Sequence, residues 1–457
     1  MTSAVGQGTL RTLLVLAWPV VVARSSQAVI GFCDALMTSS LGEDELAAVT
    51  TGSLNAFALA ILPMGIAFIV QSFAAQLRGK GDLVAAHRYG WYGLILSAIV
   101  AVVAVAAIPL VGPVLGLLDY EPAVHEHMSA YLAIRLLAIG PFVATEALGN
   151  WFGGLGNTRL HMIAGLTAMA FNVFLNWVLI YGNLGAPAMG VEGAAVASVI
   201  ATCIGLGFLL YAFGRRWVIP RPPGPLRLRA SEFARMLRFG VPNGLNWFLE
   251  FGAFLLFINV FVAELGTATL AAMMVVFNIN SVSFMPALGL ASAGAILTGE
   301  AIGRGRPDDV PRFVKTTMAV AAIWQCTVGL FYLLIPSALM SLFAPDDVRS
   351  AELLEVGAVM LAISAAWQMF DAAVLTLSEA LRSAGDTTWT LWARLAMAWL
   401  VFVPAAFVSV KVLGGGHVAA MLCVVGYVAL LAGLFAWRFR GGAWRRIDLT
   451  GVDPIAV

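Results

Sequence analysis

The sequence predicts an all-α polytopic membrane protein with about 12 transmembrane helices in two pseudo-symmetric six-helix lobes. Three observations support this fold class. Hydrophobic residues make up 61% of the 457 residues and charged residues only 11%, and the mean hydropathy is +0.91, whereas soluble domains contain roughly 45–50% apolar and 25% charged residues. Long apolar segments recur along the whole chain. Short motifs of the first half return in the second half in the same order.

A helix needs about 20 predominantly apolar residues to cross the hydrocarbon core of a bilayer. About 12 segments reach that length, and the longer ones allow for tilt or extension beyond the lipid. The first segment contains Trp18 and Pro19, and Arg11 is the only charged residue that precedes its apolar part. It lacks a small-residue cleavage site, so we expect a retained span rather than a removed signal peptide. The predicted spans are 11–38, 46–76, 89–118, 127–153, 159–182, 190–214, 232–264, 268–302, 312–343, 351–381, 388–411 and 416–438.

The longer connections between the spans alternate in charge. Those after spans 2, 6, 8 and 12 are basic, as in "GRRWVIPRPPGPLRLRASEFARMLR" (214–238), whereas those after odd-numbered spans are acidic or neutral, as in "LGEDEL" (41–46). Because Lys and Arg are enriched in cytoplasmic loops, we expect both termini to face the cytoplasm of a bacterial-type inner membrane. The basic loops are interpreted as topology signals and headgroup contacts, not as a nucleic-acid surface.

The second half of the chain repeats motifs of the first half. We therefore expect two related lobes, residues 1–220 and 221–457, joined by the Pro- and Arg-rich segment after the sixth span. Because six is even, both lobes begin on the same side of the membrane, so the repeat is parallel with its pseudo-two-fold axis along the membrane normal. The matching motifs are "LAWPVVVA" (16–23) with "LRFGVPNGLN" (237–246), "LGEDELAAV" (41–49) with "LGTATLAAM" (265–273), "RGKGD" (78–82) with "GRGRPD" (303–308), and "GLGNTR" (154–159) with "SAGDTT" (383–388).

The sequence contains no motif typical of an enzyme on a helix or loop where it could act. No HExxH, Walker or GxSxG motif stands in a suitable context. The acidic pairs Asp308-Asp309 and Asp346-Asp347 lie beside prolines in expected loops, where helix N-capping or solvation explains them. The four cysteines occur singly in apolar segments, so neither a disulfide framework nor a zinc site is indicated. We predict no enzyme activity, no catalytic residue and no cofactor.

Several motifs are similar to those of one transporter family. The segment "FNVFLNWVLIYGNLGAPAMGVEGAAVAS" (171–198), the motif "GLGNTR" and the paired "LGxxxLAA" motifs resemble those of multidrug and toxic compound extrusion (MATE) transporters. Glu in the seventh span and Asp in the tenth, in "WQMFDAAVL" (367–375), are similar to the NorM branch. The resemblance extends in order over essentially the whole chain. It implies a two-lobed secondary exporter of organic, chiefly cationic, compounds that takes in Na⁺ or H⁺ by alternating access.

Three acidic side chains lie within predicted spans: Asp34 in the first, Glu250 in the seventh and Asp371 in the tenth. A charged side chain at the centre of a span costs roughly 2.5–3.5 kcal/mol on insertion scales, so such residues are functional candidates that face the bundle interior. Burial raises the pKa of a carboxyl group and a nearby cation lowers it, so such a group can exchange a proton for a metal ion or a cationic compound. We predict that all three couple transport to a cation and supply the ligands if that cation is a metal.

The expected cation site of the N-terminal lobe adds amides to Asp34. Asn172 and Asn176 are four residues apart and share one face of the fifth span, and their amide oxygens suit a hard cation such as Na⁺. The resemblance implies that these positions line the site together with the hydroxyl of "GAAVAS" (193–198), here Ser198. The alternative is that the two amides only join helices by interhelical hydrogen bonds.

For the C-terminal lobe, the resemblance implies that Glu250 and Asp371 meet, because spans 7 and 10 are then neighbours. The alternative is a structural pair in which one protonated acid bonds the other. One turn before Asp371, some Na⁺-linked relatives are expected to have a tyrosine, whereas this chain has Trp367, which offers no oxygen ligand. Both H⁺ and Na⁺ therefore stay candidates for the coupling ion.

Arg24 is an unusual cation inside the first span. It follows Arg11 by 13 residues (24 − 11), on the order of 20 Å along a helix. The repeat offset of 224 (265 − 41) places it opposite Phe248, less than one turn from Glu250. Arg24 is predicted either to form a buried ion pair that closes one conformation or to contact substrate, which would admit anionic or zwitterionic compounds beside cations.

Other polar side chains are weaker candidates. Gln27, Asn246 and Asn278, with Trp367, are expected to line a substrate cavity, and the many Met and aromatic residues would suit its apolar wall, although packing alone explains any one of them. Three further acids are expected toward cytoplasmic helix ends, where solvation or a neighbouring arginine suffices. They are Glu146 with Arg135, Glu300 with Arg304 and Glu379 with Arg382.

Two other functions are compatible with a polytopic membrane chain. A lipid-linked oligosaccharide flippase of the same superfamily is expected to have extra helices and a strongly cationic cavity. This sequence instead predicts about 12 spans, with Arg24 as the single arginine expected deep inside a span. A receptor or scaffold would move no substrate. The expected partners are small-molecule drugs or metabolites and membrane lipid, with no nucleic acid, and the protein is expected to be a monomer.

Overall fold

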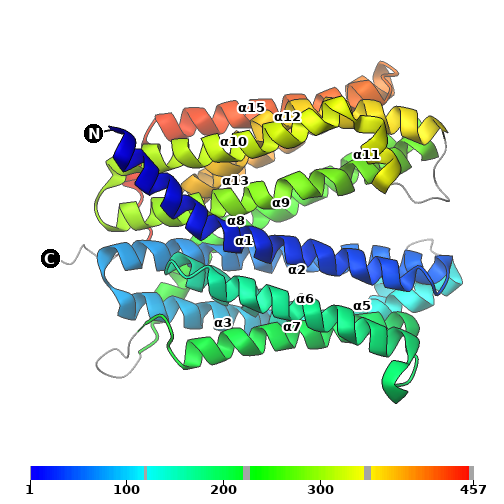
Figure 1. Ribbon diagram of the computed structural model, residues 1–457, viewed down its shortest axis with the longest axis horizontal. Coiled ribbons are helices and arrows are strands. Elements are labelled where there is room, and N and C mark those ends of the chain that lie inside the picture. Colours follow the sequence, from blue (N-terminus) through cyan, green and yellow to red (C-terminus); the bar gives the residue numbers. More distant parts are fainter. Residues whose placement is uncertain (1, 118–120, 220–226, 344–350, 452–457) are drawn as a thin grey trace. The chain divides into compact units, whose positions relative to one another are not determined.

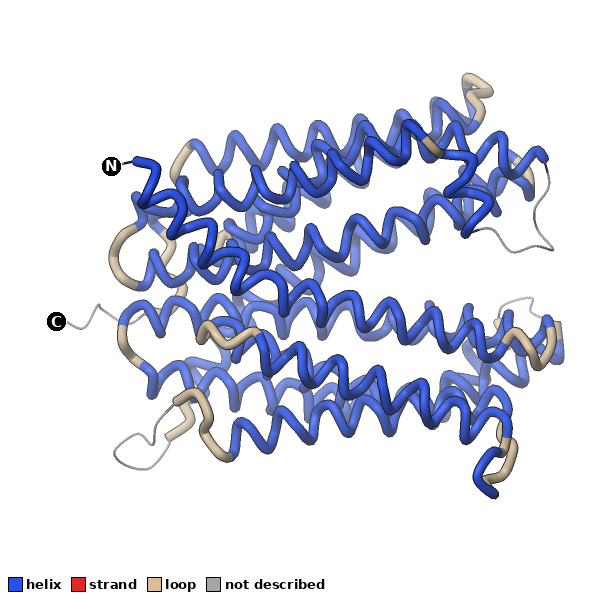
Figure 2. The backbone as a smooth tube through the Cα atoms, in the orientation of Figure 1, coloured by secondary structure: helices blue, strands red, loops and turns tan. Residues whose placement is uncertain are grey.

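The computed structural model describes residues 2–117, 121–219, 227–343 and 351–451. Helices joined by short loops account for the fold, and no strand occurs within these ranges (Figure 2). Twelve helical segments in the described ranges are long and apolar enough to cross a membrane, which confirms the predicted fold class. The helices are α1 (Thr2–Thr38), α2 (Glu43–Lys80), α3 (Leu83–Ala107), α4 (Val111–Leu115), α5 (Pro122–Gly154), α6 (Arg159–Tyr181), α7 (Gly190–Gly214), α8 (Ala230–Leu256), α9 (Thr267–Gly303), α10 (Val310–Leu334), α11 (Pro336–Phe343), α12 (Ala351–Ala384), α13 (Thr387–Ala396), α14 (Val403–Ala406) and α15 (His417–Arg440). Three segments are π-helical, namely η3 (Phe257–Val262), η6 (Met397–Phe402) and η7 (Phe407–Val412).

The chain divides into two compact units. The N-terminal unit contains Val22–Gly244, and the C-terminal unit contains Leu245–Val452 together with the segment before Val22. The division therefore falls inside α1 and α8 rather than in the loop after the sixth span. The first half of α1 belongs to the C-terminal unit because Leu13 and Leu16 pack against Leu290 of α9. The lobe limits predicted from the sequence, 1–220 and 221–457, stay a prediction.

Each unit is built around one long helix. In the N-terminal unit, α5 packs against α2, α3 and α7, and α6 runs beside α7 (Figure 1). In the C-terminal unit, α12 packs in the same way against α9, α10 and α15. In chain order, α2, α3, α5 and α7 of one unit correspond to α9, α10, α12 and α15 of the other. The packing therefore repeats with the sequence motifs.

The repeated glycine motifs form the same turn in both units. Gly81, Gly156, Gly305 and Gly385 follow the last residues of α2, α5, α9 and α12 with φ of +80°, +81°, +71° and +90°. In each turn, the amide of the next residue donates to a carbonyl five positions back, as Asp386 N does to Leu381 O at 2.9 Å. This is the Schellman end of a helix, where glycine adopts the left-handed conformation without a steric penalty. The geometry confirms the internal repeat.

The ninth predicted span is broken near its end in the structure. The predicted span 312–343 is interrupted, since α10 ends at Leu334 and Pro336 begins the separate helix α11. Ile335 between them leaves the helical region, with φ −135° and ψ 44°, because a residue before proline is disfavoured in the α conformation. The predicted end at 118 lies outside the described residues.

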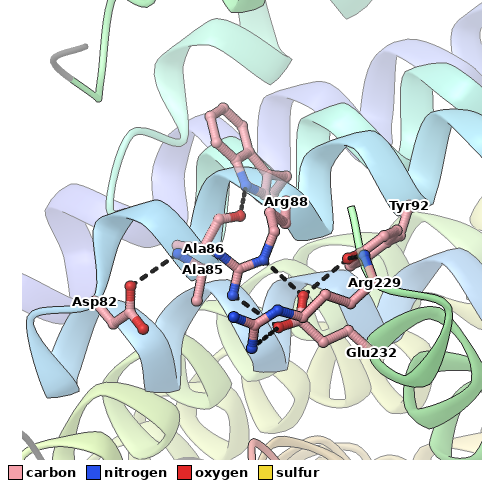
Figure 3. A network of polar contacts seen from close by, with 8 residues as sticks. Asp82, Ala85, Ala86, Arg88, Tyr92, Arg229 and Glu232 are labelled. Carbon is pink, nitrogen blue, oxygen red and sulfur yellow. Dashed lines mark hydrogen bonds and ion pairs between the residues drawn. The ribbon is translucent and has the colours of Figure 1, made fainter. Parts of the chain in front are cut away.

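A polar network attaches the beginning of α8 to α3 within the N-terminal unit (Figure 3). The Glu232 carboxylate accepts hydrogen bonds from Arg88 Nε and Nη2, both at 2.7 Å, and from Tyr92 Oη at 2.8 Å. The backbone amide of Arg229 donates to Tyr92 Oη at 2.8 Å. The charged side chains are only 12% and 14% exposed. The bidentate pair therefore holds α8 in a defined position against α3.

Glu232→Gln is expected to lower the stability of the purified protein by about 1–3 kcal/mol, because hydrogen bonds to charged groups contribute about 1.5–3 kcal/mol. Glu264→Gln is the matched control, since Glu264 pairs with Lys411 but is 51% exposed, and exposed ion pairs contribute about 0–1 kcal/mol. Thermal unfolding of both variants in the same detergent provides the comparison. Equal midpoints for the two variants would contradict an anchoring role of Glu232.

Candidate functional site

The structure brings together the four residues predicted for the N-terminal cation site. Asp34 lies on α1, Asn172 and Asn176 on α6, and Ser198 on α7. Asp34 Oδ1 accepts a hydrogen bond from Asn176 Nδ2 at 2.6 Å, and its Oδ2 accepts one from Ser198 Oγ at 3.0 Å. Asn172 Nδ2 in turn donates to Ser198 Oγ at 3.1 Å. All four residues are buried, so three helices contribute to one enclosed polar cluster.

This N-terminal cluster has spare capacity for a ligand. Asn176 Oδ1 is buried and has no hydrogen-bond partner, and Asn172 Oδ1 takes only a long bond of 3.4 Å from Asn176. An unsatisfied buried carbonyl oxygen is unfavourable by about 1–3 kcal/mol. Together with the Asp34 carboxylate, these oxygens are of the type that a hard cation prefers. Binding of a small cation or a proton at Asp34 stays a prediction.

A second polar cluster in the N-terminal unit surrounds Glu146 of α5. Arg24 Nη1 forms an ion pair with Glu146 Oε2 at 2.9 Å, and Gln27 Nε2 donates to Oε1 at 2.8 Å. His161 Nε2 lies 3.8 Å from Oε1, and Asn150 Nδ2 lies 3.4 Å from Oε2. Glu146 has no exposed surface. The expectation that solvent or Arg135 suffices for Glu146 is therefore wrong.

The same cluster determines the position of Arg24. Of the two roles predicted for this residue, the structure shows the buried ion pair, and its partner is Glu146. The guanidinium also lies 4.8 Å from the centre of the Phe68 ring, a cation–π contact. Gln27, predicted to line a substrate cavity, points its amide at the same carboxylate. By contrast, the expected arginine partners of Glu300 and Glu379 are confirmed.

In the C-terminal unit, Glu250 of α8 is paired with a cation that was not predicted. Arg394 of α13 forms an ion pair with Glu250 through Nη1, and its Nη2 lies 3.3 Å from Ser378 Oγ. Tyr427 Oη donates to Glu250 Oε1 at 3.3 Å. Arg394 is 8% exposed, whereas the Glu250 side chain is 29% exposed. The carboxylate is therefore accessible from one side and neutralised from the other.

Asp371 has a partner of its own on a neighbouring helix. Its Oδ2 accepts a hydrogen bond from Gln325 Nε2 of α10 at 3.0 Å. Arg394, the partner of Glu250, lies 3.3 Å from Ser378 Oγ of α12, the helix that also carries Asp371. Within the described residues, no hydrogen bond joins Glu250 directly to Asp371. The alternative of one acid bonding the other is therefore not observed.

The other predicted cavity residues of the C-terminal unit differ in position. Trp367 packs against the hydrophobic core of this unit, and Asn278 is exposed. Asn246 is buried and lines a narrow hollow beside Glu250, together with Arg394, Trp399 and four aliphatic side chains.

A third buried polar group of the C-terminal unit was not predicted from the sequence. Gln368 Nε2 donates to Asn280 Oδ1 at 2.5 Å, Ser283 Oγ donates to Gln368 Oε1 at 2.8 Å, and Asn280 Nδ2 donates to Ser364 Oγ at 3.2 Å. This network joins α9 to α12 next to Trp367. Arg394 was overlooked as well, although it lies within a predicted span, where any charged side chain is a functional candidate.

Nothing in the described parts of the chain resembles a transition-metal centre, since no three His, Cys, Asp or Glu side chains converge there. Asp34 is surrounded by amides and a hydroxyl, and Glu250 by a guanidinium and a phenol.

Comparison with known proteins identifies the family. The MatE family model matches residues 19–178 and matches again at residues 242–408. The chain belongs to the MATE family. The two matches begin 223 residues apart (242 − 19), close to the offset of 224 between the glycine motifs that precede α2 and α9. Membership in the family and the 12 apolar helices show an integral membrane protein.

Curated relatives cover most of the MATE chain. It is 28% identical over 374 residues to the probable multidrug resistance protein NorM of Thermotoga maritima. The aligned region covers 81% of this chain and 79% of the relative. It is 27% identical over 427 residues to the multidrug resistance protein NorM of Burkholderia vietnamiensis, with coverage of 93% and 92%. A solved structure of a MOP superfamily transporter from Pyrococcus furiosus shares the fold, with a TM-score of 0.88, 19% identity and coverage of 96% and 97%. The chain is therefore a NorM-like MATE protein.

Proposed function

We propose that this MATE protein is a secondary active multidrug exporter that exchanges organic, chiefly cationic, compounds for Na⁺ or H⁺ by alternating access. The observation that carries the proposal is that each unit contains an intramembrane carboxylate held by polar partners, Asp34 in one and Glu250 with Asp371 in the other. The multidrug resistance proteins to which the chain is similar support export as the direction of transport.

In the N-terminal unit, the coupling ion is expected to bind at Asp34. A proton would neutralise the carboxylate directly, whereas Na⁺ would draw on the oxygens of Asp34, Asn172 and Asn176. The unpartnered Asn176 Oδ1 supports this arrangement. Ser198 would keep Asp34 oriented through its 3.0 Å hydrogen bond. Release of the ion to the cytoplasm would leave the carboxylate charged and ready for the next cycle.

In the C-terminal unit, Arg394 favours H⁺ over Na⁺ as the ion that acts at Glu250. The guanidinium already occupies one side of the carboxylate, so a metal ion would lie beside a fixed positive charge, which is electrostatically unfavourable. A proton avoids this conflict. A cationic substrate would then compete with protonation for Glu250, and binding of one would release the other.

The free energy of transport depends on the number of ions. Each elementary charge that moves inward gains roughly 2.3 kcal/mol per 100 mV. Exchange of one monovalent cation for one monovalent ion moves no net charge, so the membrane potential contributes only if a second ion enters. Acidic clusters in both units offer places for two ions. We infer a monomer in a bacterial-type inner membrane, with both termini in the cytoplasm and substrates that are small organic molecules.

Dye efflux from cells with Na⁺ and pH gradients imposed separately tests the proposal. Export is expected to follow the pH gradient, and a Na⁺ gradient alone is expected to support it only if Asp34 binds Na⁺. A collapse of both gradients should stop export. Continued export without either gradient would exclude exchange, and the lack of any flux would instead favour a receptor or scaffold.

A further inference from the structure

Gln325 of α10 holds Asp371 through one hydrogen bond and leaves half of its own amide unused. Its Nε2 donates to Asp371 Oδ2 at 3.0 Å. The Gln325 side chain has no exposed surface, yet its Oε1 has no hydrogen-bond partner among the residues that the structure describes. Buried polar atoms without a partner are rare in proteins. The idle oxygen beside an intramembrane acid therefore indicates a role in another state of that acid.

Gln368 shows how a purely structural amide is bonded in the same unit. It lies on α12 three residues before Asp371 (371 − 368). Its Oε1 accepts from Ser283 Oγ at 2.8 Å, and its Nε2 donates to Asn280 Oδ1 at 2.5 Å. Both halves of this amide are satisfied by groups that do not change charge. Gln325 differs, because its donor contacts a titratable acid while its acceptor is idle.

Titratable side chains from α8, α13 and α15 are engaged with one another rather than with Asp371. Glu250 pairs with Arg394 and accepts a hydrogen bond from Tyr427. In the described part of the chain, Gln325 supplies the one hydrogen bond that the Asp371 side chain forms. Asp371 is partly exposed, so a proton can reach it. The protein group that orients this acid is therefore the Gln325 amide.

The packing of α10 on α12 holds the amide beside the acid. The two helices lie against each other. One turn after Gln325, Gly329 contacts α12, since a Cβ added to it would lie 3.6 Å from the Ala365 Cβ. On the other side, the Trp324 indole donates to Ser283 O of α9 at 3.0 Å. These contacts fix α10 against both neighbours, so the amide does not need to move far to serve either state of the acid.

We propose that Gln325 is a positioning residue for Asp371 in both protonation states, donating to the carboxylate and, once the acid is protonated, also accepting its O–H. A carboxylate only accepts hydrogen bonds, so it uses Nε2 and leaves Oε1 idle. A carboxylic acid has a donor beside an acceptor, as the end of a glutamine side chain does, so the two planar groups can form two parallel hydrogen bonds. The idle Oε1 is then the acceptor of the protonated state.

Proton uptake at Asp371 then strengthens the contact between two helices. In the charged form, one hydrogen bond joins α10 to α12 through this acid, and the protonated form adds a second. The presence of the proton is thereby converted into a change of packing within the unit. The assignment rests on the proposed export function, in which Asp371 exchanges a proton, and it names the residue that keeps this acid in place throughout the cycle.

Infrared difference spectra of the purified full-length protein, recorded between alkaline and acidic pH, test this pair. The C=O stretch of protonated Asp371 is identified as the band that Asp371→Asn removes, and its wavenumber rises when the acid loses its hydrogen bonds. Gln325→Met keeps the length of the side chain and removes both polar atoms, so it is expected to shift the band to higher wavenumber. Gln325→Asn withdraws the amide by one methylene group and is expected to shift the band in the same direction.

Thr327→Val is the matched control. Thr327 lies on the same helix at an exposed position, and its hydroxyl bonds to Ile323 O of that helix, so its band should match that of the wild type. A band at the wild-type position in both Gln325 variants would overturn the proposal. A shift of equal size in the control, or the lack of any carboxyl band that Asp371→Asn removes, would overturn it as well.

Failure of the proposed function has a different signature. In that case, proteoliposomes of the wild-type protein would move no dye under an imposed pH gradient. The infrared bands do not depend on transport and would still decide whether Gln325 pairs with protonated Asp371.

Discussion

Glu250→Gln is expected to reduce dye export to the background of cells that lack the protein. The amide cannot take up or release a proton, and it leaves Arg394 without the carboxylate that neutralises it. Asp371→Asn is expected to have the same effect, because it removes the second acid of the C-terminal unit. Efflux measured in whole cells, normalised to the amount of protein in the membrane, gives the result. Efflux retained in both variants would defeat the assignment.

A double variant separates coupling from simple charge balance. If Glu250 serves only to neutralise Arg394, Glu250→Gln combined with Arg394→Leu should restore export, since no unpaired charge is then left. If Glu250 must be charged and discharged in each cycle, the double variant should be correctly inserted and still inactive. Glu355→Gln, at an exposed position of α12, is the matched control and should export as the wild type does.

The fold could be predicted from the sequence because the signals that determine it are local. The length of each apolar segment determines whether it can span a bilayer, and the repeated glycines mark turns that need a left-handed residue, as Gly156 and Gly385 show. The N-terminal cluster was predicted for a related reason. Asn172 and Asn176 share a helical face, and the resemblance to MATE transporters placed Asp34 and Ser198 with them.

The ion pairs of Glu250 and Glu146 could not be predicted in the same way, because they join distant parts of the chain. Glu250 and Arg394 are 144 residues apart, and Arg24 and Glu146 are 122 residues apart. Helical periodicity gives the face of each residue on its own helix but not the neighbour that this face meets. The repeat offset directed attention to Phe248 as the counterpart of Arg24, whereas the charged partner is Glu146 in the same unit.

Helical faces can also be assigned wrongly at close range. Asn278 was predicted to line a cavity and is exposed, whereas Asn280 is buried and bonded to Gln368. Side chains two residues apart in an α-helix point about 200° away from each other. Asn278 and Asn280 therefore lie on nearly opposite faces of the helix, and choosing the wrong one assigns the wrong face to the interior. In an apolar span, few polar residues mark the buried face, and the pattern leaves this choice open.

The largest loss of stability is expected from Glu146→Gln, in the polar cluster of the N-terminal unit. Glu146 has no exposed surface, and Arg24 is 6% exposed. Removing one member of a buried ion pair leaves an uncompensated charge and typically costs about 3–5 kcal/mol. Thermal unfolding of the purified protein measures the loss. Asp308→Asn is the control, because Asp308 pairs with Arg445 but is 88% exposed, where about 0–1 kcal/mol is expected.

Replacing both members of the pair distinguishes structural from substrate-binding roles of Arg24. Arg24→Met with Glu146→Leu removes both charges and keeps apolar volume, and such replacements of buried pairs are often neutral or stabilising. The double variant should therefore regain most of the stability that Glu146→Gln loses. If Arg24 acts only in this ion pair, export should return with stability, since Asp34, Glu250 and Asp371 are unchanged. A stable double variant that exports nothing would instead assign Arg24 to substrate or ion binding, because stability and transport would then depend on different properties of the same side chain.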